Sequence, residues 1–292
     1  MLSDASRETQ KGIKMIVALH SAQKGFFKTD PPHSNNELIG FVQKAALLGF
    51  KAVQIGPLRD YVPIEGKHLR TVLQELQIER NVHVGEVYDA ERFALTEQEY
   101  VTAKKRMHYG IALCKEISST SVSIHPPFFA TKNEVNHELL SKARTRFLEL
   151  VKEEADFANR NDVKIALESF CYYPFIFKGL HDFAQFISKF PSEKLGVLLD
   201  IGHLYQIGIS LSEAIQLFKH RLADIHVHDA TLDKDFRKAT HFPIGRGTIN
   251  FPELINLLRE VDYDGWLTLE IRGTEKEIVE SKDYLENLVT NT

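Results

Sequence analysis

The chain has 292 residues, of which 43% are hydrophobic and 26% are charged, and its formal net charge is −4. This composition is typical of a globular protein with a large core, and it provides no overall basic field that would attract nucleic acid. No stretch approaches the roughly 18 apolar residues that a membrane span requires, and no apolar signal-peptide segment opens the chain, so we expect a cytoplasmic protein with no membrane partner.

Strand and helix patterns alternate along the whole chain. The predicted buried strands lie at residues 13–19, 52–55, 82–84, 121–125, 163–168, 195–199, 223–226 and 266–270. The predicted helices between them lie at about 35–48, 67–76, 97–117, 133–158, 181–189, 211–219 and 252–260, and a polar helix ends the chain. The strand starts are 28 to 43 residues apart, which is the size of one strand-plus-helix unit.

Eight such units in one uninterrupted chain predict an α/β protein with the fold of a single-domain (β/α)8 TIM barrel. We expect the barrel to occupy residues 13–292 and residues 1–12 to form a flexible N-terminal arm, because these residues are polar and mixed in charge. The main alternative is an open doubly wound sheet. That fold usually carries a glycine-rich dinucleotide turn after its first strand, and no such turn follows residues 13–19.

Potential metal ligands stand at the ends of five predicted strands. They are His125, Glu168, Asp200, His226 and Glu270. In a TIM barrel the strand ends meet at one mouth, where three carboxylates repel one another unless a cation or protons compensate. Mixed carboxylate and imidazole ligands suit Mn²⁺, Co²⁺, Zn²⁺ or Mg²⁺. The sequence therefore predicts one divalent metal ion at the mouth.

Each of these residues has an ordinary structural interpretation when taken alone. A single histidine at a strand end is more often a hydrogen-bonded core residue, and a single glutamate there is often a solvated loop residue. The repetition at the same place in successive units favours a metal site. His203 either orients Asp200 or forms a hydrogen bond with a substrate.

Several motifs resemble those of the xylose isomerase-like barrel superfamily. They are Leu167-Glu168-Ser169, Leu199-Asp200-Ile201-Gly202-His203, His226-Val227-His228-Asp229, His241 with Gly245-Arg246-Gly247, and Leu269-Glu270. This superfamily contains sugar isomerases and epimerases of the tagatose epimerase type, inosose dehydratase-like enzymes and endonuclease IV. The resemblance covers nearly the whole chain and implies a TIM barrel with a metal site. It also implies a sugar or sugar phosphate as the small-molecule partner. A homo-oligomer is compatible with the sequence.

The epimerase branch implies a role for each matched residue. One ion is held by Glu168, Asp200, His226 and Glu270. The two glutamates then act as acid and base on opposite sides of the substrate, and the ion stabilises an enediolate while a carboxylate removes the neighbouring proton. His203 contacts a substrate oxygen in this interpretation.

Other residues are candidates for binding the substrate. Arg246 and Arg272 have positions from which a guanidinium would pair with a phosphate or carboxylate, although an exposed surface role is equally compatible with the sequence. His228 either supports His226 or lines the mouth. We also place His125 and His241 among the substrate-binding candidates.

The endonuclease IV branch is the alternative, with metal-dependent cleavage of abasic DNA. His125, His203 and His241 match further ligands of that branch, but Ala239 stands where an aspartate is expected. We also expect the histidine of that branch after the third strand to be replaced within residues 84–86. A related sugar dehydratase and a non-catalytic sugar-binding barrel also stay open.

Overall fold

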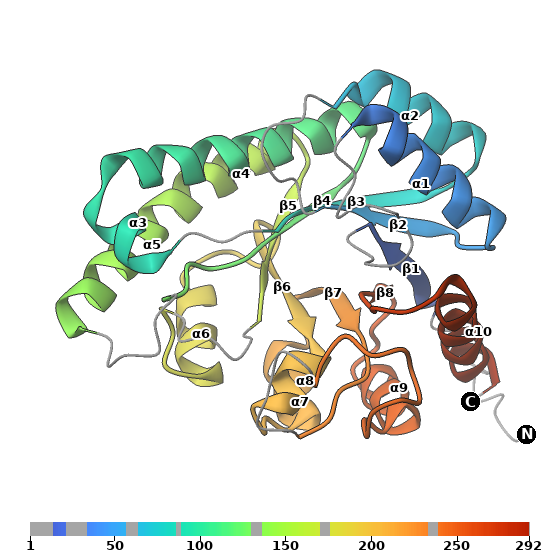
Figure 1. Ribbon diagram of the computed structural model, residues 1–292. Coiled ribbons are helices and arrows are strands. Elements are labelled where there is room, and N and C mark those ends of the chain that lie inside the picture. The colour runs from blue at the N-terminus through green and yellow to red at the C-terminus, as the bar shows by residue number, and fades with distance from the viewer. Residues whose placement is uncertain are drawn as a thin grey trace, which may run out of the picture.

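The computed structural model describes residues 14–21, 34–56, 64–85, 89–129, 136–169, 176–232 and 239–291. The arm expected at residues 1–12 lies outside this part of the chain. Eight parallel strands form a closed barrel in the order of the sequence, and helices surround it (Figure 1). The predicted (β/α)8 barrel is therefore confirmed.

Each strand pairs with the next along the chain, and β8 closes the barrel by pairing with β1. The strands are β1 Ile16–His20, β2 Ala52–Ile55, β3 Glu79–Val84, β4 Ser121–Ile124, β5 Lys164–Glu168, β6 Leu195–Asp200, β7 Leu222–Val227 and β8 Trp266–Leu269. The third strand starts three residues before its predicted start at Val82. That extension matters because it places three residues of β3, Glu79, Asn81 and His83, on the same face, where the predicted strand places only His83.

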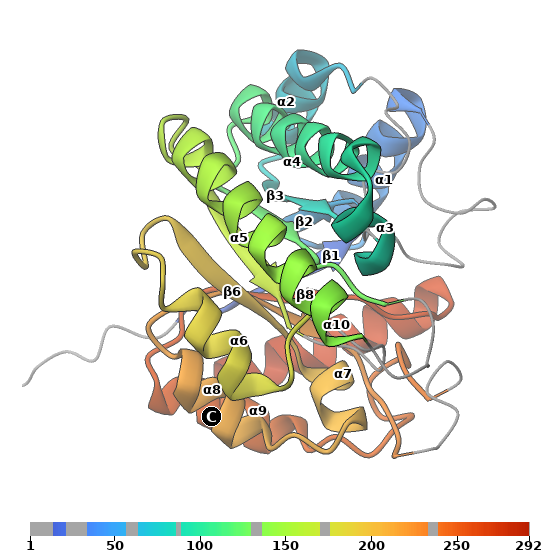
Figure 2. The ribbon, with the colours of Figure 1, turned by 90° about the vertical axis from the view of Figure 1, so that its left-hand side faces the viewer.

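Helices cover the outside of the barrel on all sides (Figure 2). They are α1 Asn35–Leu47, α2 Gly66–Glu75, α3 Ala90–Leu95, α4 Glu97–Ile117, α5 His137–Asn159, α6 Leu180–Ile187, α7 Ile201–Gln206, α8 Leu211–Phe218, α9 Phe251–Glu260 and α10 Glu275–Asn291. The short helices α3 and α7 were not predicted. Each begins at an aspartate, Asp89 or Asp200, whose side chain accepts a backbone N–H of the first turn.

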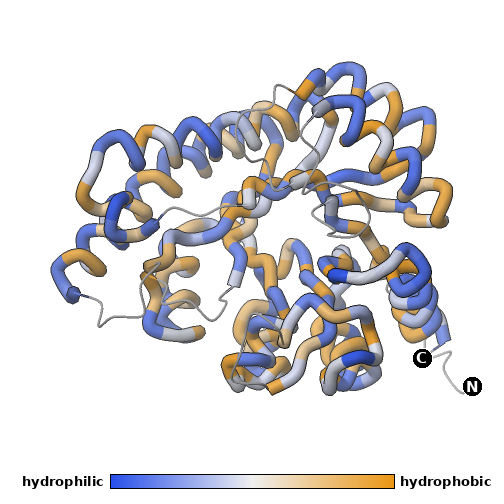
Figure 3. Tube along the Cα trace, in the orientation of Figure 1, coloured by the Kyte–Doolittle hydropathy of each residue, from blue (hydrophilic) through white to orange (hydrophobic). Residues whose placement is uncertain are grey.

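The main hydrophobic core lies between the strands and the helices. Fully buried phenylalanines such as Phe41, Phe147 and Phe183 fill this layer. In Figure 3 the helices alternate between hydrophobic and hydrophilic residues along their length. This alternation is typical of helices that bury one side. In the described part of the chain no helix is both long and apolar enough to span a bilayer.

The inside of the barrel is polar by contrast. Successive strand residues point to opposite faces, so positions two apart share one face. In β3, Glu79, Asn81 and His83 alternate in this way, and in β5 the corresponding residues are Lys164, Ala166 and Glu168. The interior positions therefore place one set of polar residues at the start of the strands and another set at their ends.

Candidate metal centre

The acidic and imidazole side chains predicted at the strand ends lie together in the structure. Glu168 and Asp200 end β5 and β6, His226 lies near the end of β7, and Glu270 follows β8 directly. Asp200 and His226 have no exposed surface, and Glu168 is 4% exposed. They meet because all eight parallel strands end at the same mouth of the barrel.

The geometry centres on Nδ1 of His226. This nitrogen lies 3.0 Å from Oε2 of Glu270, 3.8 Å from Oε1 of Glu168 and 3.9 Å from Oδ2 of Asp200. Despite these short distances, Nδ1 of His226 and Oδ2 of Asp200 are both buried without an aligned hydrogen-bond partner among the described residues. Two such atoms side by side are costly unless a further group satisfies them.

Two mid-strand residues fix the orientation of the His226 ring. Oε1 of Gln54 accepts a hydrogen bond from Nε2 of His226 at 2.7 Å, and Nε2 of Gln54 donates to Oδ2 of Asp224 at 2.8 Å. The carboxylate of Asp224 also accepts from Thr268 Oγ1 at 2.8 Å. Because Nε2 of His226 is used as a donor in this arrangement, Nδ1 is the nitrogen that faces the three acids.

The neighbouring charges shift the pKa values of the buried side chains in the site. Burial by itself raises the pKa of Asp200, but the His203 and His228 rings outweigh it and lower the pKa to about 2. Burial lowers the pKa of His226, yet the charges of Glu168 and Glu270 outweigh it and raise the pKa to about 10. Without a metal ion, a proton on His226 therefore partly balances the three carboxylates at neutral pH.

The residues present fit a divalent cation. Asp200, His226 and Glu270 each offer one ligand atom within 4.8 Å of the others, and His83, Glu168 and His226 form a second such group. Carboxylate oxygens combined with one or two imidazole nitrogens suit Mn²⁺, Co²⁺ or Zn²⁺. The residues of these groups would hold the ion through atoms that otherwise have no aligned partner, notably Nδ1 of His226 and Oδ2 of Asp200.

Beside Glu168 lie the predicted His125 and two histidines that were not predicted as site residues, His83 and His20. Nε2 of His83 lies 2.9 Å from Oε2 of Glu168, and Nε2 of His125 lies 2.7 Å from the same oxygen. His20, at the end of β1, lies 3.2 Å from the other nitrogen of His83. Glu168 thus turns one oxygen toward His83 and His125 and the other toward His226.

The replacement expected within residues 84–86, of a histidine after the third strand, stays a prediction, and Glu86 lies outside the described residues. The structure does bring a histidine of β3 itself to the mouth, His83, one residue before the end of that strand. The sequence did contain a clue to this residue, because His83 lies within the predicted strand. The alternation of the longer strand, not the residue after it, places that side chain at the mouth.

His203, His228 and His241 form a third group, with ligand atoms within 4.8 Å of one another. Nε2 of His228 lies 2.9 Å from Oδ1 of Asp200, and its Nδ1 accepts the backbone N–H of His241 at 3.1 Å. Both ring nitrogens of His228 are therefore engaged, and this side chain holds Asp200 in place. Gly202 is required here because a Cβ at this position would lie 1.9 Å from the His228 ring.

The two candidate arginines, Arg246 and Arg272, differ in the contacts that they make. Arg246 forms an ion pair with Glu277 of α10, and its side chain is 65% exposed. Arg272 is exposed, and its backbone N–H donates to the carbonyl of His241 at 2.6 Å. The Gly245-Arg246-Gly247 loop is held by Asp229, whose Oδ2 accepts the N–H groups of Gly245 at 2.9 Å and Gly247 at 2.8 Å.

A family model for the xylose isomerase-like TIM barrel matches residues 42–288. The chain belongs to this family. The match includes the seven strands from β2 to β8 and therefore all the carboxylates of the site. Membership of the xylose isomerase-like family confirms the predicted resemblance.

Several curated proteins are similar to this chain at low sequence identity. "Uncharacterized protein MJ1311" of Methanocaldococcus jannaschii is 29% identical over 59% of this chain and 58% of its own length. An inosose dehydratase of Clostridium botulinum is 22% identical over 78% of this chain and 80% of its own. "Probable endonuclease 4" of Mycoplasma mycoides subsp. mycoides is 26% identical over 62% and 65%.

Solved structures with a similar fold include sugar epimerases. The D-psicose 3-epimerase of Clostridium cellulolyticum H10, crystallised with D-tagatose, superposes with a TM-score of 0.75 over 94% of this chain and 99% of that chain. The two sequences are 16% identical. This likeness shows the shared fold, and the chemistry of the present site has to be argued from its own residues.

Proposed function

We propose that this chain is a metal-dependent isomerase or epimerase of a sugar or sugar phosphate, which removes a proton from the carbon next to a carbonyl. The proposal is carried by the convergence of three carboxylates on Nδ1 of His226 at the mouth of the barrel. When bound there by Glu168, Asp200, His226 and Glu270, one divalent cation would neutralise charge that develops on the sugar oxygens.

Glu270 and Glu168 are the proposed acid and base. The side chain of Glu270 is 22% exposed, so a substrate in the mouth has access to its carboxylate. The side chain of Glu168 is 5% exposed, and His83 and His125 fix one of its oxygens. A carboxylate that approaches a C–H group to about 3 Å can take up its proton, and a second on the other side can return one.

The remaining polar residues would position the sugar. The side chains of His125 and His203 are 28% and 10% exposed, and each offers a ring nitrogen near the acids for a substrate hydroxyl. His241 is only partly buried. Arg246 and Arg272 are the proposed contacts for a phosphate, if the substrate carries one. In this proposal His228 acts by positioning Asp200.

Exchange of carbon-bound hydrogen with solvent tests this function. The protein, loaded with Mn²⁺ and with its ion content measured, is incubated in D2O with a panel of ketoses, aldoses and their phosphates. Nuclear magnetic resonance should show loss of the C–H signal next to a carbonyl for at least one sugar. Product analysis then separates isomerisation and epimerisation from loss of water, which the same proton removal can initiate.

The control is the Glu168→Gln variant, which keeps the shape of the side chain but cannot act as a base. It should lose exchange with the same sugar. Absence of exchange across the panel with the ion-loaded protein would overturn the proposal, and tight sugar binding without exchange would indicate a non-catalytic binding barrel.

Hydrolysis of a phosphodiester is the second candidate, and the His83–Glu168–His125 contacts favour it. One oxygen of Glu168 faces His83 and His125, and its other oxygen faces His226. These side chains would together hold two cations, and paired cations can promote cleavage of phosphodiesters. Against this, Ala239 supplies no ligand to the His203 and His241 group. The test measures the ion content of the protein and its nicking of abasic DNA. One ion per chain together with no nicking would exclude phosphodiester hydrolysis.

A further inference from the structure

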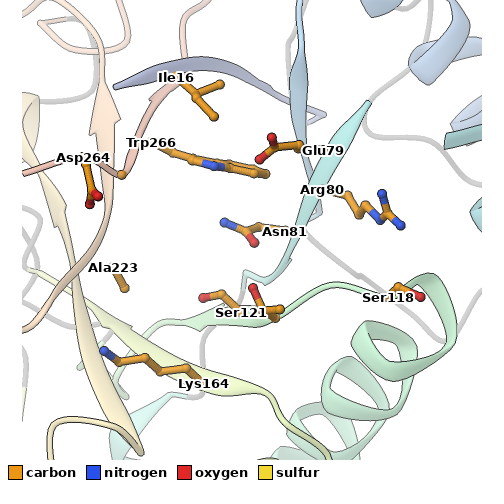
Figure 4. Close-up of a pocket in the computed structure, with 12 residues that line it drawn as sticks. Ile16, Glu79, Arg80, Asn81, Ser118, Ser121, Lys164, Ala223, Asp264 and Trp266 are labelled. Carbon is orange, nitrogen blue, oxygen red and sulfur yellow. The ribbon is translucent and has the colours of Figure 1, made fainter. Parts of the chain in front are cut away.

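A second polar cavity lies at the opposite end of the barrel from the metal centre. Its volume is about 510 Å³, and its lining includes the first residues of β1, β3, β4, β5 and β8. Figure 4 shows Trp266, Asn81, Ser121 and Lys164 around it, with the Trp266 ring lying across one side. None of these four residues belongs to the proposed sugar site.

The cavity follows from the residues at the start of the strands. The residues there include Ser121 and Ala223 in the cavity lining, whose small side chains cannot fill the barrel. Gly196 also makes room for Lys164, because a Cβ at this position would lie 2.9 Å from Cε of the lysine. The lysine stem can therefore lie along β6.

Two polar side chains in this cavity have no partner in the described part of the chain. Asn81 is 7% exposed, yet neither a hydrogen bond nor an ion pair engages its side-chain amide. The ammonium group of the half-buried Lys164 likewise has no acidic group within ion-pair distance. Burial lowers the pKa of Lys164, with a further contribution from Arg221. The amide of the largely buried Asn81 and the ammonium of Lys164 are therefore available to a ligand or to ordered water in the cavity.

The chemistry of the lining selects the class of ligand. An ammonium group and an indole N–H are donors only, so Lys164 and Trp266 favour a ligand with acceptor oxygens and negative charge. The face of the Trp266 ring suits a flat apolar group. Glu79 and Asp264 lie exposed at the rim and oppose multiply charged anions such as polyphosphates. Arg80 donates to the carbonyls of Ile117 and Ile78 and is already engaged.

We propose that this cavity binds a small organic monoanion, whose carboxylate or similar group contacts Lys164 and Asn81 and whose flat apolar part lies against Trp266. The site is independent of the metal centre, because its residues start the strands whose ends carry the metal ligands. It gives the barrel a second ligand site, remote from the chemistry.

The chain contains a single tryptophan, so its fluorescence reports on this cavity alone. The experiment titrates the full-length protein with benzoate and, as a neutral ligand of the same shape, with benzamide. Benzoate should change the Trp266 emission saturably with a Kd of about 1 mM or lower, and benzamide should bind at least about tenfold more weakly.

Substitutions of single lysines test whether Lys164 supplies the positive charge that binds benzoate. Lys164→Met keeps the unbranched stem of the side chain without its charge and should reduce benzoate affinity to that of benzamide. Lys276→Met removes an exposed charge, 83% exposed, from α10 and should leave benzoate binding unchanged. Asn81→Ala, which removes the amide without altering charge, should weaken benzoate binding several-fold.

Three results would overturn the proposal. They are no saturable change in Trp266 emission with either compound, equal affinity for benzoate and benzamide, and equal benzoate affinity in the wild type and the Lys164→Met variant. Circular dichroism spectra of each variant confirm that it is folded before the comparison is made. Sugar turnover is not part of the readout, so failure here leaves the proposed isomerase function untouched.

Discussion

The two ends of the barrel interior differ in how their polar side chains are satisfied. At the ends of the strands, acids and imidazoles lie 2.7 to 3.9 Å from one another, as in the contacts of Glu168 with His125 and of His226 with Asp200. At the starts of the strands, Asn81 and Lys164 border a cavity without such partners. The same strands serve both ends, since β3 carries Asn81 and His83, and β5 carries Lys164 and Glu168.

This difference indicates two kinds of site on one scaffold. The mouth concentrates negative charge, which a small cation can balance, while the cavity at the other end presents donors to a larger ligand. The strand alternation supplies both arrangements without any change of fold. Substitutions at the mouth are therefore expected to affect ion binding and turnover, but not the emission of Trp266.

The largest effect is expected for Glu270→Gln. Removing one of the two proposed acid/base carboxylates should lower the rate of solvent exchange into the sugar by about 10²- to 10⁴-fold, because general acid–base catalysis contributes this much. The measurement is the exchange rate at saturating sugar and saturating Mn²⁺. Glu260→Gln, an exposed acid of α9, is the matched control and should exchange at the wild-type rate. Equal rates for both variants would remove Glu270 from the chemistry.

Ion binding should strengthen with pH. In the metal-free protein the pKa of His226 is raised to about 10, so at neutral pH a cation must displace one proton from this ring. The apparent Kd for Mn²⁺ should therefore fall about tenfold for each pH unit between roughly pH 6 and 8. Titration calorimetry in buffers of different ionisation enthalpy measures the released proton directly. An affinity that does not vary with pH would contradict the assignment of His226.

A smaller loss of ion affinity should follow from Gln54→Met. This change removes the acceptor that holds Nε2 of His226, and loss of such an orienting contact typically weakens metal binding about 10- to 100-fold. Thr268→Val is the matched control, because it also removes one hydrogen bond to Asp224 but leaves the His226 contact intact. If both variants bind Mn²⁺ equally well, the orienting role of Gln54 is wrong.

The smallest effect is expected for Arg246→Ala with an unphosphorylated sugar. The side chain is exposed and paired with Glu277, so kcat/KM should change by no more than about twofold. With a phosphorylated sugar, loss of a charge-assisted contact should instead raise KM about tenfold. Comparing the two substrates shows whether the Gly245–Gly247 loop recognises phosphate. A large effect with both sugars would place Arg246 in the chemistry itself.

Much of this protein was determined by local sequence patterns. The alternation of strands and helices predicted the barrel, and the acids and histidines at strand ends predicted which residues gather at one mouth, because parallel strands all end on one face. The short helices α3 and α7 escaped prediction, since each is only six residues long and depends on its aspartate cap.

Only the closed barrel decided the remaining contacts. Gln54 lies in the middle of an ordinary strand pattern, and its partners Asp224 and His226 are 170 and 172 residues away in the chain. His83 was not predicted as a site residue because it lies inside its strand and not after its end, and only the closed barrel shows that its ring contacts Glu168 of β5. The cavity beside Trp266 likewise depends on side-chain volumes summed around eight strands. Periodicity fixes the face on which a residue lies, but closure of the barrel determines what stands opposite to it.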